Sequence, residues 1–216
     1  MRRQALAVVR ILIEKKINLD LQALIKEALK NYEGKIEDQL RELTQFFLDR
    51  LRAWYVANGV QAKVFDAVLS SIDSSISNLG TNPLDFEKRI HAVVAFQKLP
   101  AAENLAAANK RVRNLLEKNN VKNTGKLPAV DPSLLSAMEE KQLFHAIEIK
   151  ESEIVPLMST GNYTAVLQSL ASLQSPVDNF FDKVMVMVDD EKVRTNRLHL
   201  LLRLQNLFLH VADISV

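Results

Sequence analysis

Apolar positions recur every three or four residues along most of the chain, a spacing that predicts α-helices. The three clearest series run through residues 36–54, 105–116 and 193–211. The only β-like run, residues 184–188, is short and continuous rather than alternating, and it suits a buried helix equally well. The pattern therefore predicts an all-α fold, a multi-helix bundle.

Glycine and proline mark the breaks between these helices. The five glycines and six prolines fall mostly between the periodic segments, as expected because both residue types disfavour helix interiors. Asp20 precedes a predicted helix that begins near residue 21. Asp131 and Ser175 each precede a proline, which predicts a capped helix start at both places. The second of these predicted helices covers residues 176–187.

Residues 70–82 are rich in small polar side chains and predict a domain boundary. We therefore expect a helical connecting subdomain over residues 1–80 and a helical bundle over residues 81–216. Residues 119–131 contain several turn-forming residues, and they predict an exposed loop inside the bundle.

The last predicted helix has two contrasting sides. Its apolar side carries Val193, Leu200, Leu204, Leu207 and Val211. The other side is polar at every helical repeat, which predicts that it faces water or a ligand. That polar side comprises Lys192, Asn196, His199, Arg203, Asn206 and His210.

Composition narrows the class of protein. Hydrophobic residues make up 48% of the chain and charged residues 25%, both ordinary for a globular protein. The absence of cysteine excludes disulfides and thiolate metal sites. No segment approaches the roughly 20 apolar residues that span a membrane. We expect a cytoplasmic protein that binds no membrane.

The sequence offers no support for an autonomous enzyme. The four histidines stand alone, without the paired spacing of a metal site. A glycine-rich phosphate loop and a nucleophile elbow are both missing. We therefore predict no catalytic residue and no metal ligand in this chain.

The first of two basic clusters lies on the predicted helix over residues 101–118. It contains Lys110, Arg111, Arg113 and Lys118, around Val112 of the apolar stripe. Lysine and arginine on a shared surface suit phosphate binding. The residues alone favour a solvated helix face balanced by nearby acids, and the net charge of only +2 does not argue otherwise.

The second cluster opens the last helix. Arg197 interrupts the apolar stripe, and because a buried arginine is costly without a partner, we predict an ion pair. The candidate acids are Asp178, Asp182 and Asp189. Arg194 also belongs to this cluster. The residues that remain free to face a ligand are Lys192, Asn196, Arg203 and the neighbouring His199.

Four large apolar side chains stand beside this second cluster. Exposed aromatic side chains stack on unpaired RNA bases. At this spacing, next to an apolar helix, core packing is the favoured interpretation. The four residues are Phe180, Phe181, Met185 and Met187.

Two segments resemble a known family of helical anticodon-binding domains. Residues 178–198 read Asp-Asn-Phe-Phe-Asp-Lys, a Val/Met run, an acidic turn and then Arg-Thr-Asn-Arg-Leu. Residues 107–116 read Ala-Ala-Asn-Lys-Arg-Val-Arg-Asn-Leu-Leu. Both resemble the DALR-type domain shared by arginyl-tRNA synthetases and the β subunits of bacterial glycyl-tRNA synthetases.

Three further segments resemble the glycyl β subunit. They are the opening residues 2–12, the stretch over residues 47–69 that contains Phe-Leu-Asp-Arg-Leu-Arg-Ala-Trp-Tyr, and the ending over residues 209–215. The resemblance covers nearly the whole chain and points to the C-terminal region of a considerably longer subunit.

The resemblance implies a task in protein synthesis. We expect binding to the anticodon stem-loop of tRNA(Gly), which positions the tRNA for aminoacylation by a separate α subunit. ATP and magnesium are expected in that α subunit, with no cofactor in this chain. The residues in the matched motifs that we expect to bind tRNA are Lys110, Arg111, Arg113, Arg194, Asn196 and Arg203.

Two alternatives remain open. A helical scaffold or adaptor that binds a protein partner fits the composition equally well, and it would show an exposed apolar groove. An arginyl-type anticodon-binding domain fits the two shared segments, although it would lack the N-terminal segment.

Overall fold

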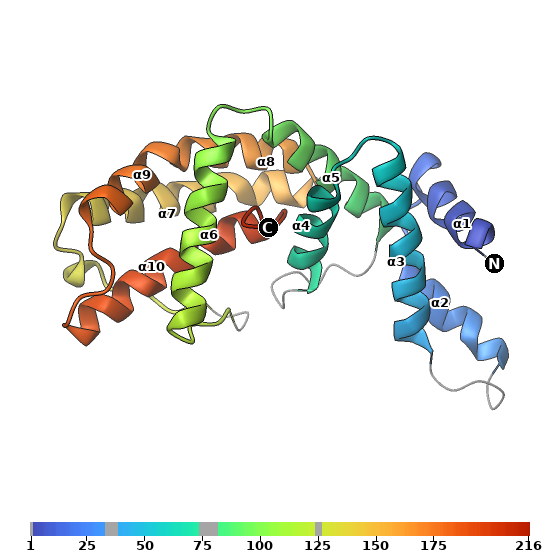
Figure 1. The fold of residues 1–216 in the computed structure, drawn as a ribbon, viewed down its shortest axis with the longest axis horizontal. Coiled ribbons are helices and arrows are strands. Elements are labelled where there is room, and N and C mark those ends of the chain that lie inside the picture. The colour runs from blue at the N-terminus through green and yellow to red at the C-terminus, as the bar shows by residue number, and fades with distance from the viewer. Residues whose placement is uncertain (1, 33–38, 74–81, 124–126) are drawn as a thin grey trace.

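The computed structural model describes residues 2–32, 39–73, 82–123 and 127–216. Within those residues it contains ten α-helices and no strand (Figure 1). The predicted all-α fold is confirmed. Most of the predicted domain boundary falls on residues 74–81, outside the described residues, and the division at residue 80 stays a prediction.

Four helices form the N-terminal part: α1 (Arg2–Glu14), α2 (Leu21–Leu29), α3 (Leu40–Ala57) and α4 (Ala62–Asp73). Asp20 caps α2 as predicted, accepting a hydrogen bond from the Ala23 amide at 2.7 Å. Helix α3 packs against α1, α2 and α4, and its buried side chains include Leu48, Leu51 and Tyr55. The predicted stripe is therefore rotated, and several of its members are only partly buried.

The remaining helices are α5 (Pro83–Phe96), α6 (Ala102–Lys118), α7 (Met138–Ser159), α8 (Tyr163–Leu170), α9 (Gln174–Lys183) and α10 (Glu191–Leu209). Helix α5 joins the two ends of the molecule, because it contacts α1 and α4 on one side and α8 on the other (Figure 1).

The structure contradicts the prediction that the polar side of the last helix, α10, is open to a ligand. It packs against α6, α7 and α8, and much of its polar side is covered. Asn196 is only 4% exposed and Asn206 only 9%. These amides fit inside because other segments satisfy their hydrogen bonds: Asn196 binds the backbone of Asp131, and Asn206 accepts from Asn123.

The segment before α10 also differs from the prediction. Helix α9 begins at Gln174, so that Pro176 lies in its first turn. It ends at Lys183 rather than at residue 187. The following residues are not helical. Val184 and Val186 are buried there, whereas Met185 is 74% and Met187 44% exposed. The prediction of core packing is therefore wrong for the two methionines, whereas Phe180 is fully buried, as that prediction requires.

Arg197 is a buried ion-pair residue, as predicted, but its partner is Glu140 rather than an aspartate of 178–189. Its Nε donates to Oε1 of Glu140 at 2.6 Å, and its Nη1 donates to the Met185 carbonyl. The second oxygen of Glu140 accepts from the Ala137 amide at the start of α7. The pair thus links α10 to α7, and Arg197 also links α10 to the loop that precedes it.

Arg89 on α5 is the largest fully buried side chain, with no exposed surface. Its Nε donates to Asp85 at 2.7 Å, and its Nη1 donates to the carbonyls of His210 and Val211 at 2.7 and 3.0 Å. Its Nη2 donates to the Tyr163 hydroxyl on α8 at 3.1 Å. One guanidinium therefore joins α5, α8 and the end of α10.

Tyr163 completes this arrangement by donating its hydroxyl hydrogen to Asp85. Burial, together with the hydrogen bond to Asp85, raises the pKa of Tyr163 to about 12. The hydroxyl therefore stays protonated at neutral pH and remains a donor.

The C-terminal segment after α10 runs back over the N-terminal part. The Asp213 amide donates to the Ala67 carbonyl of α4 at 2.8 Å, and the Ser71 hydroxyl donates to the Val211 carbonyl at 3.2 Å. Arg113 of α6 binds the same segment through Asp213 and Ser215. The chain therefore ends between α4 and α6 (Figure 1).

We expect Arg89→Met to lower the free energy of unfolding by about 3–5 kcal/mol, because it leaves Asp85 without its paired charge and the His210 carbonyl without its donor. Urea unfolding measures the loss. The exposed Lys88→Met on the same helix is the control and should change stability by less than about 0.5 kcal/mol. A loss below about 1 kcal/mol for Arg89→Met would contradict its role as the link between helices.

The Arg197–Glu140 pair predicts a pH dependence of stability. Burial alone would raise the pKa of Glu140, but hydrogen bonds from Arg197 and the Ala137 amide, with the charge of Arg197, hold it below its ordinary 4.5. A carboxyl with a lower pKa in the folded state stabilises the fold above the unfolded pKa, and loses that contribution as the pH falls through the folded pKa. Glu140→Gln should therefore lose less stability than the unmodified chain between about pH 5 and 3. Urea unfolding across this range tests it, with the exposed Glu117→Gln as control, and equal slopes for all three proteins would rule it out.

Candidate nucleic-acid interface

Helix α6 presents a basic surface because its other side is fixed in the core. Leu105, Ala108, Val112 and Leu116 are buried, as the apolar series predicted. The opposite side exposes Lys110, Arg111, Asn114 and Lys118, which we call the α6 basic face. None of its three cations forms an ion pair within 4.0 Å anywhere in the described part of the chain.

Arg111 is held in position by an aromatic ring. Its guanidinium lies over Phe181 of α9, 4.3 Å from the ring centroid. Such a cation–π contact orients the guanidinium while leaving its N–H groups available. Asp178 and Asp182 line the hollow beside it, so the basic face has an acidic border on the α9 side.

Two of the other predicted binding residues, Arg113 and Arg194, are bound to other parts of the chain. Arg113 forms ion pairs with Glu117 at 3.1 Å and with Asp213 at 3.7 Å, away from the α6 basic face. Arg194 donates to the carbonyls of Val188 and Asp189 at 2.8 and 3.4 Å, and thereby holds the loop that leads into α10.

Asn196 and Arg203 are also bound within the protein. The Asn196 side chain accepts from the Asp131 amide at 2.7 Å and donates to the Asp131 carbonyl at 2.9 Å. Arg203 binds Glu151 through two N–H groups and lies over the ring of Phe144. The structure thus brings Lys110 and Arg111 onto one open face and places the other four predicted residues elsewhere. Their part in binding remains a prediction.

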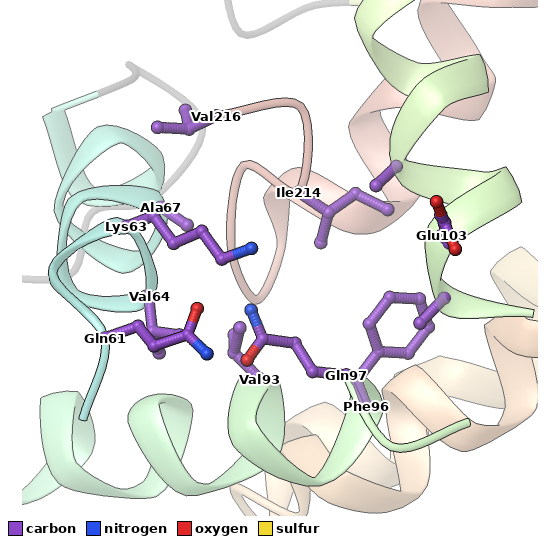
Figure 2. Close-up of a pocket in the computed structure, with 12 residues that line it drawn as sticks. Gln61, Lys63, Val64, Ala67, Val93, Phe96, Gln97, Glu103, Ile214 and Val216 are labelled. Atoms are coloured by element: carbon purple, nitrogen blue, oxygen red, sulfur yellow. The ribbon is translucent and has the colours of Figure 1, made fainter. Parts of the chain in front are cut away.

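A pocket of about 420 Å³ lies between α4, α5, α6 and the C-terminal segment (Figure 2). Its floor is apolar and includes Val64, Val93, Phe96 and Ile214. Sequence reasoning missed it, because its walls come from segments up to about 150 residues apart and no short motif connects them.

Four polar side chains surround this pocket: Gln61, Lys63, Gln97 and Glu103. In Figure 2 the polar ends of Gln61, Lys63 and Gln97 gather on one side, and Glu103 stands on the wall formed by α6. None of the four side chains has a hydrogen bond or ion pair to another described residue. The pocket therefore combines an apolar floor with unused donors and acceptors.

The described residues contain no group of three or more histidine, aspartate or glutamate side chains arranged to hold a metal ion.

Among the helices that the structure describes, none has the length and apolar character needed to cross a membrane.

Comparison with protein families identifies the class of this helical domain as anticodon-binding. The model of the DALR anticodon binding domain matches residues 105–214, which include α6 and α10. The model of the glycyl-tRNA synthetase beta subunit matches residues 1–70, the segment that an arginyl-type enzyme is expected to lack.

Curated relatives extend this result over the whole chain. Glycine–tRNA ligase beta subunits of Marinobacter nauticus and Coxiella burnetii are each 45% identical over the full chain, and one from Pseudomonas aeruginosa is 46% identical. The chain belongs to the glycyl-tRNA synthetase beta subunit family and carries its DALR anticodon binding domain. It spans about 30% of the length of these relatives.

We expect Asn196→Ala to lower the free energy of unfolding by about 2–3 kcal/mol, because the Asp131 amide and carbonyl lose their partner in a buried setting. Chemical denaturation measures this change. His199→Ala, one turn further along α10 and more exposed, is the control. An unchanged stability for Asn196→Ala would show that Asn196 is not needed for the fold and would leave it free to act in binding.

Proposed function

We propose that the chain binds the anticodon arm of tRNA(Gly) and holds the tRNA for aminoacylation by a separate α subunit. The observation that carries this proposal is the α6 basic face. Its three cations have no acidic partner within 4.0 Å among the described residues, and they lie inside the segment matched by the anticodon-binding family model.

The face suits RNA for two physical reasons. Lysine and arginine that are not neutralised within the protein can replace the counterions of phosphates. Arg111 is already oriented by Phe181, so that less side-chain freedom is lost when it binds. The acidic border formed by Asp178 and Asp182 repels phosphates and would direct the RNA backbone along α6.

The proposed contribution to catalysis is positional. This chain would supply no reacting group. It would hold the tRNA so that the acceptor end reaches the α subunit, where we expect ATP and magnesium to be bound. Selection of the correct tRNA would follow from contacts made only with the matching anticodon.

Within this proposal the predicted residues divide into two groups. Lys110 and Arg111 contact the RNA, together with Lys118. Arg113, Arg194, Asn196 and Arg203 hold the bundle in the shape that presents this face, because each is bound to another part of the chain.

Binding of the 216-residue chain to a tRNA(Gly) anticodon stem-loop, measured by fluorescence anisotropy across a salt series, tests the proposal. The affinity should fall as salt rises. Replacing Lys110, Arg111 and Lys118 together by alanine should weaken binding at least about tenfold and make the salt dependence shallower by up to about three counterions. The matched control replaces the exposed Lys15, Lys26 and Arg41, which changes the net charge equally.

Equal losses for both triple variants would mean that only net charge matters, which would refute the α6 basic face as the site. A stem-loop with a changed anticodon should bind more weakly than the glycine one. No binding to either RNA at low salt would overturn the proposal and favour the alternative of a scaffold for a protein partner.

A further inference from the structure

The N-terminal part and the anticodon-binding bundle share helix α5, and the C-terminal segment gives them a further contact. Helix α5 packs against α1 and α4 on one side and against α8 on the other. The C-terminal segment, residues 210–216, leaves α10 and reaches α4. Two bodies that share one helix can tilt about it, and a contact away from that helix restricts the tilt. The C-terminal segment therefore bears on how the N-terminal part sits relative to the bundle.

The pocket between α4 and α6 shows why such a contact is needed. Residues of these two helices line opposite walls of a space of about 420 Å³ (Figure 2). An unfilled space carries no packing contacts across it, so side chains do not fix the separation of the two helices there. In Figure 2, Ile214 of the C-terminal segment lies between the α4 residues and Glu103 of α6. The segment thus spans the gap that side-chain packing leaves open.

Asp213 joins α4 and α6 through two different groups. Its backbone amide donates to the Ala67 carbonyl of α4 at 2.8 Å. Its carboxylate forms an ion pair with Arg113 of α6 at 3.7 Å and accepts from the Ser215 hydroxyl, which in turn accepts from Arg113 at 3.3 Å. The Asp213 side chain is only 14% exposed, against 64% for Glu117, the other acid beside Arg113. Solvent therefore screens the link to Asp213 less than the link to Glu117.

The Val211 carbonyl fixes the start of the segment. It accepts from the Arg89 guanidinium of α5 at 3.0 Å and from the Ser71 hydroxyl of α4 at 3.2 Å. Arg89 and Ser71 have no exposed surface, so water does not compete for these bonds. With its start anchored on α5 and α4, the segment delivers Asp213 to Arg113 from a fixed position.

We propose that Asp213 and Arg113 are positioning residues that hold the α6 basic face at a fixed orientation to the N-terminal part. Arg113 lies between Lys110 and Lys118 along α6, so its link to Asp213 acts on the helix that carries the cations. RNA held on this face then keeps one orientation relative to the rest of the subunit, as reaction at a distant acceptor end requires. The inference rests on the proposed function, and it gives Arg113 a task other than direct contact with RNA.

Distances between pairs of spin labels test the geometry, since the chain has no cysteine of its own. One pair joins Ser70→Cys on α4 to Asn104→Cys on α6, and a reference pair inside the bundle joins Asn104→Cys to Gln168→Cys on α8; all three positions are exposed. Asp213→Ala and Arg113→Met should each widen the α4–α6 distance distribution at least about twofold and leave the reference pair unchanged. The double variant should widen it no further, because both changes remove the same contact.

Binding and catalysis separate positioning from direct contact. The affinity of both variants for the anticodon stem-loop should stay within about twofold of the unmodified chain, whereas a lost phosphate contact would also lower the salt dependence by about one counterion. In the complete enzyme with its α subunit, both changes should lower kcat about three- to tenfold and change the KM for tRNA(Gly) less than about twofold. Glu117→Gln is the matched control, because it removes the acid that pairs with Arg113 on α6 itself. It should leave the distances, the affinity and kcat unchanged.

Each outcome bears on a different claim. Circular dichroism verifies that the variants fold, and Arg113→Met tests the contact even where Asp213→Ala fails to fold. An α4–α6 distribution that stays narrow in both variants overturns the inference, as does an unchanged kcat where the distribution widens. Weaker stem-loop binding by Arg113→Met with unchanged distances would make Arg113 an RNA contact instead. Failure of the unmodified chain to bind the stem-loop defeats the proposed function, while the distances still test the link between α4 and α6.

Discussion

The buried guanidinium of Arg89 is the constraint on which the arrangement of the helices depends. A charge without access to water must be neutralised and hydrogen-bonded on the spot. Asp85 of α5, Tyr163 of α8 and the carbonyls of the two residues that follow α10 meet that demand. Satisfying one side chain therefore fixes α5 against α8 and fixes the point at which the chain leaves α10. From there the C-terminal segment reaches α4, and this contact helps to enclose the pocket between α4, α5 and α6.

The basic residues of this chain divide according to whether the fold already uses them. Arg89, Arg197 and Arg203 form ion pairs with acids on the same or another helix, so that their charges are neutralised within the protein. Lys110, Arg111 and Lys118 have no acid within 4.0 Å among the described residues. Only the second group can exchange counterions for RNA phosphates without breaking an internal ion pair. A net charge of only +2 is thus compatible with a local basic surface, because acids such as Glu140 and Glu151 are paired with other cations.

The contrast between α6 and α10 shows how far sequence periodicity predicts a site. Both helices carry an apolar stripe and a polar stripe, and for α6 the polar stripe is exposed as predicted. For α10 the same pattern gave a wrong prediction of exposure. Helices α6, α7 and α8 pack against this helix, and hydrogen bonds inside the bundle satisfy Asn196 and Asn206. Periodicity reports which residues share a side of a helix. It does not report whether a polar side meets water or buried partners. The acid that pairs with Arg197 was missed for a related reason, since Glu140 lies 57 residues away.

The sequence by itself determined the all-α fold, the cap at Asp20, the buried stripe of α6 and, through its motifs, the family. These features depend on short-range spacing and local hydrogen bonds, which a sequence displays directly. The tertiary structure decided which polar side chains are buried, which cations remain unpaired, and that Gln61, Gln97 and Ile214 surround one pocket. Those outcomes depend on helices that meet from distant parts of the chain, where burial changes the energetic cost of every unpaired polar group.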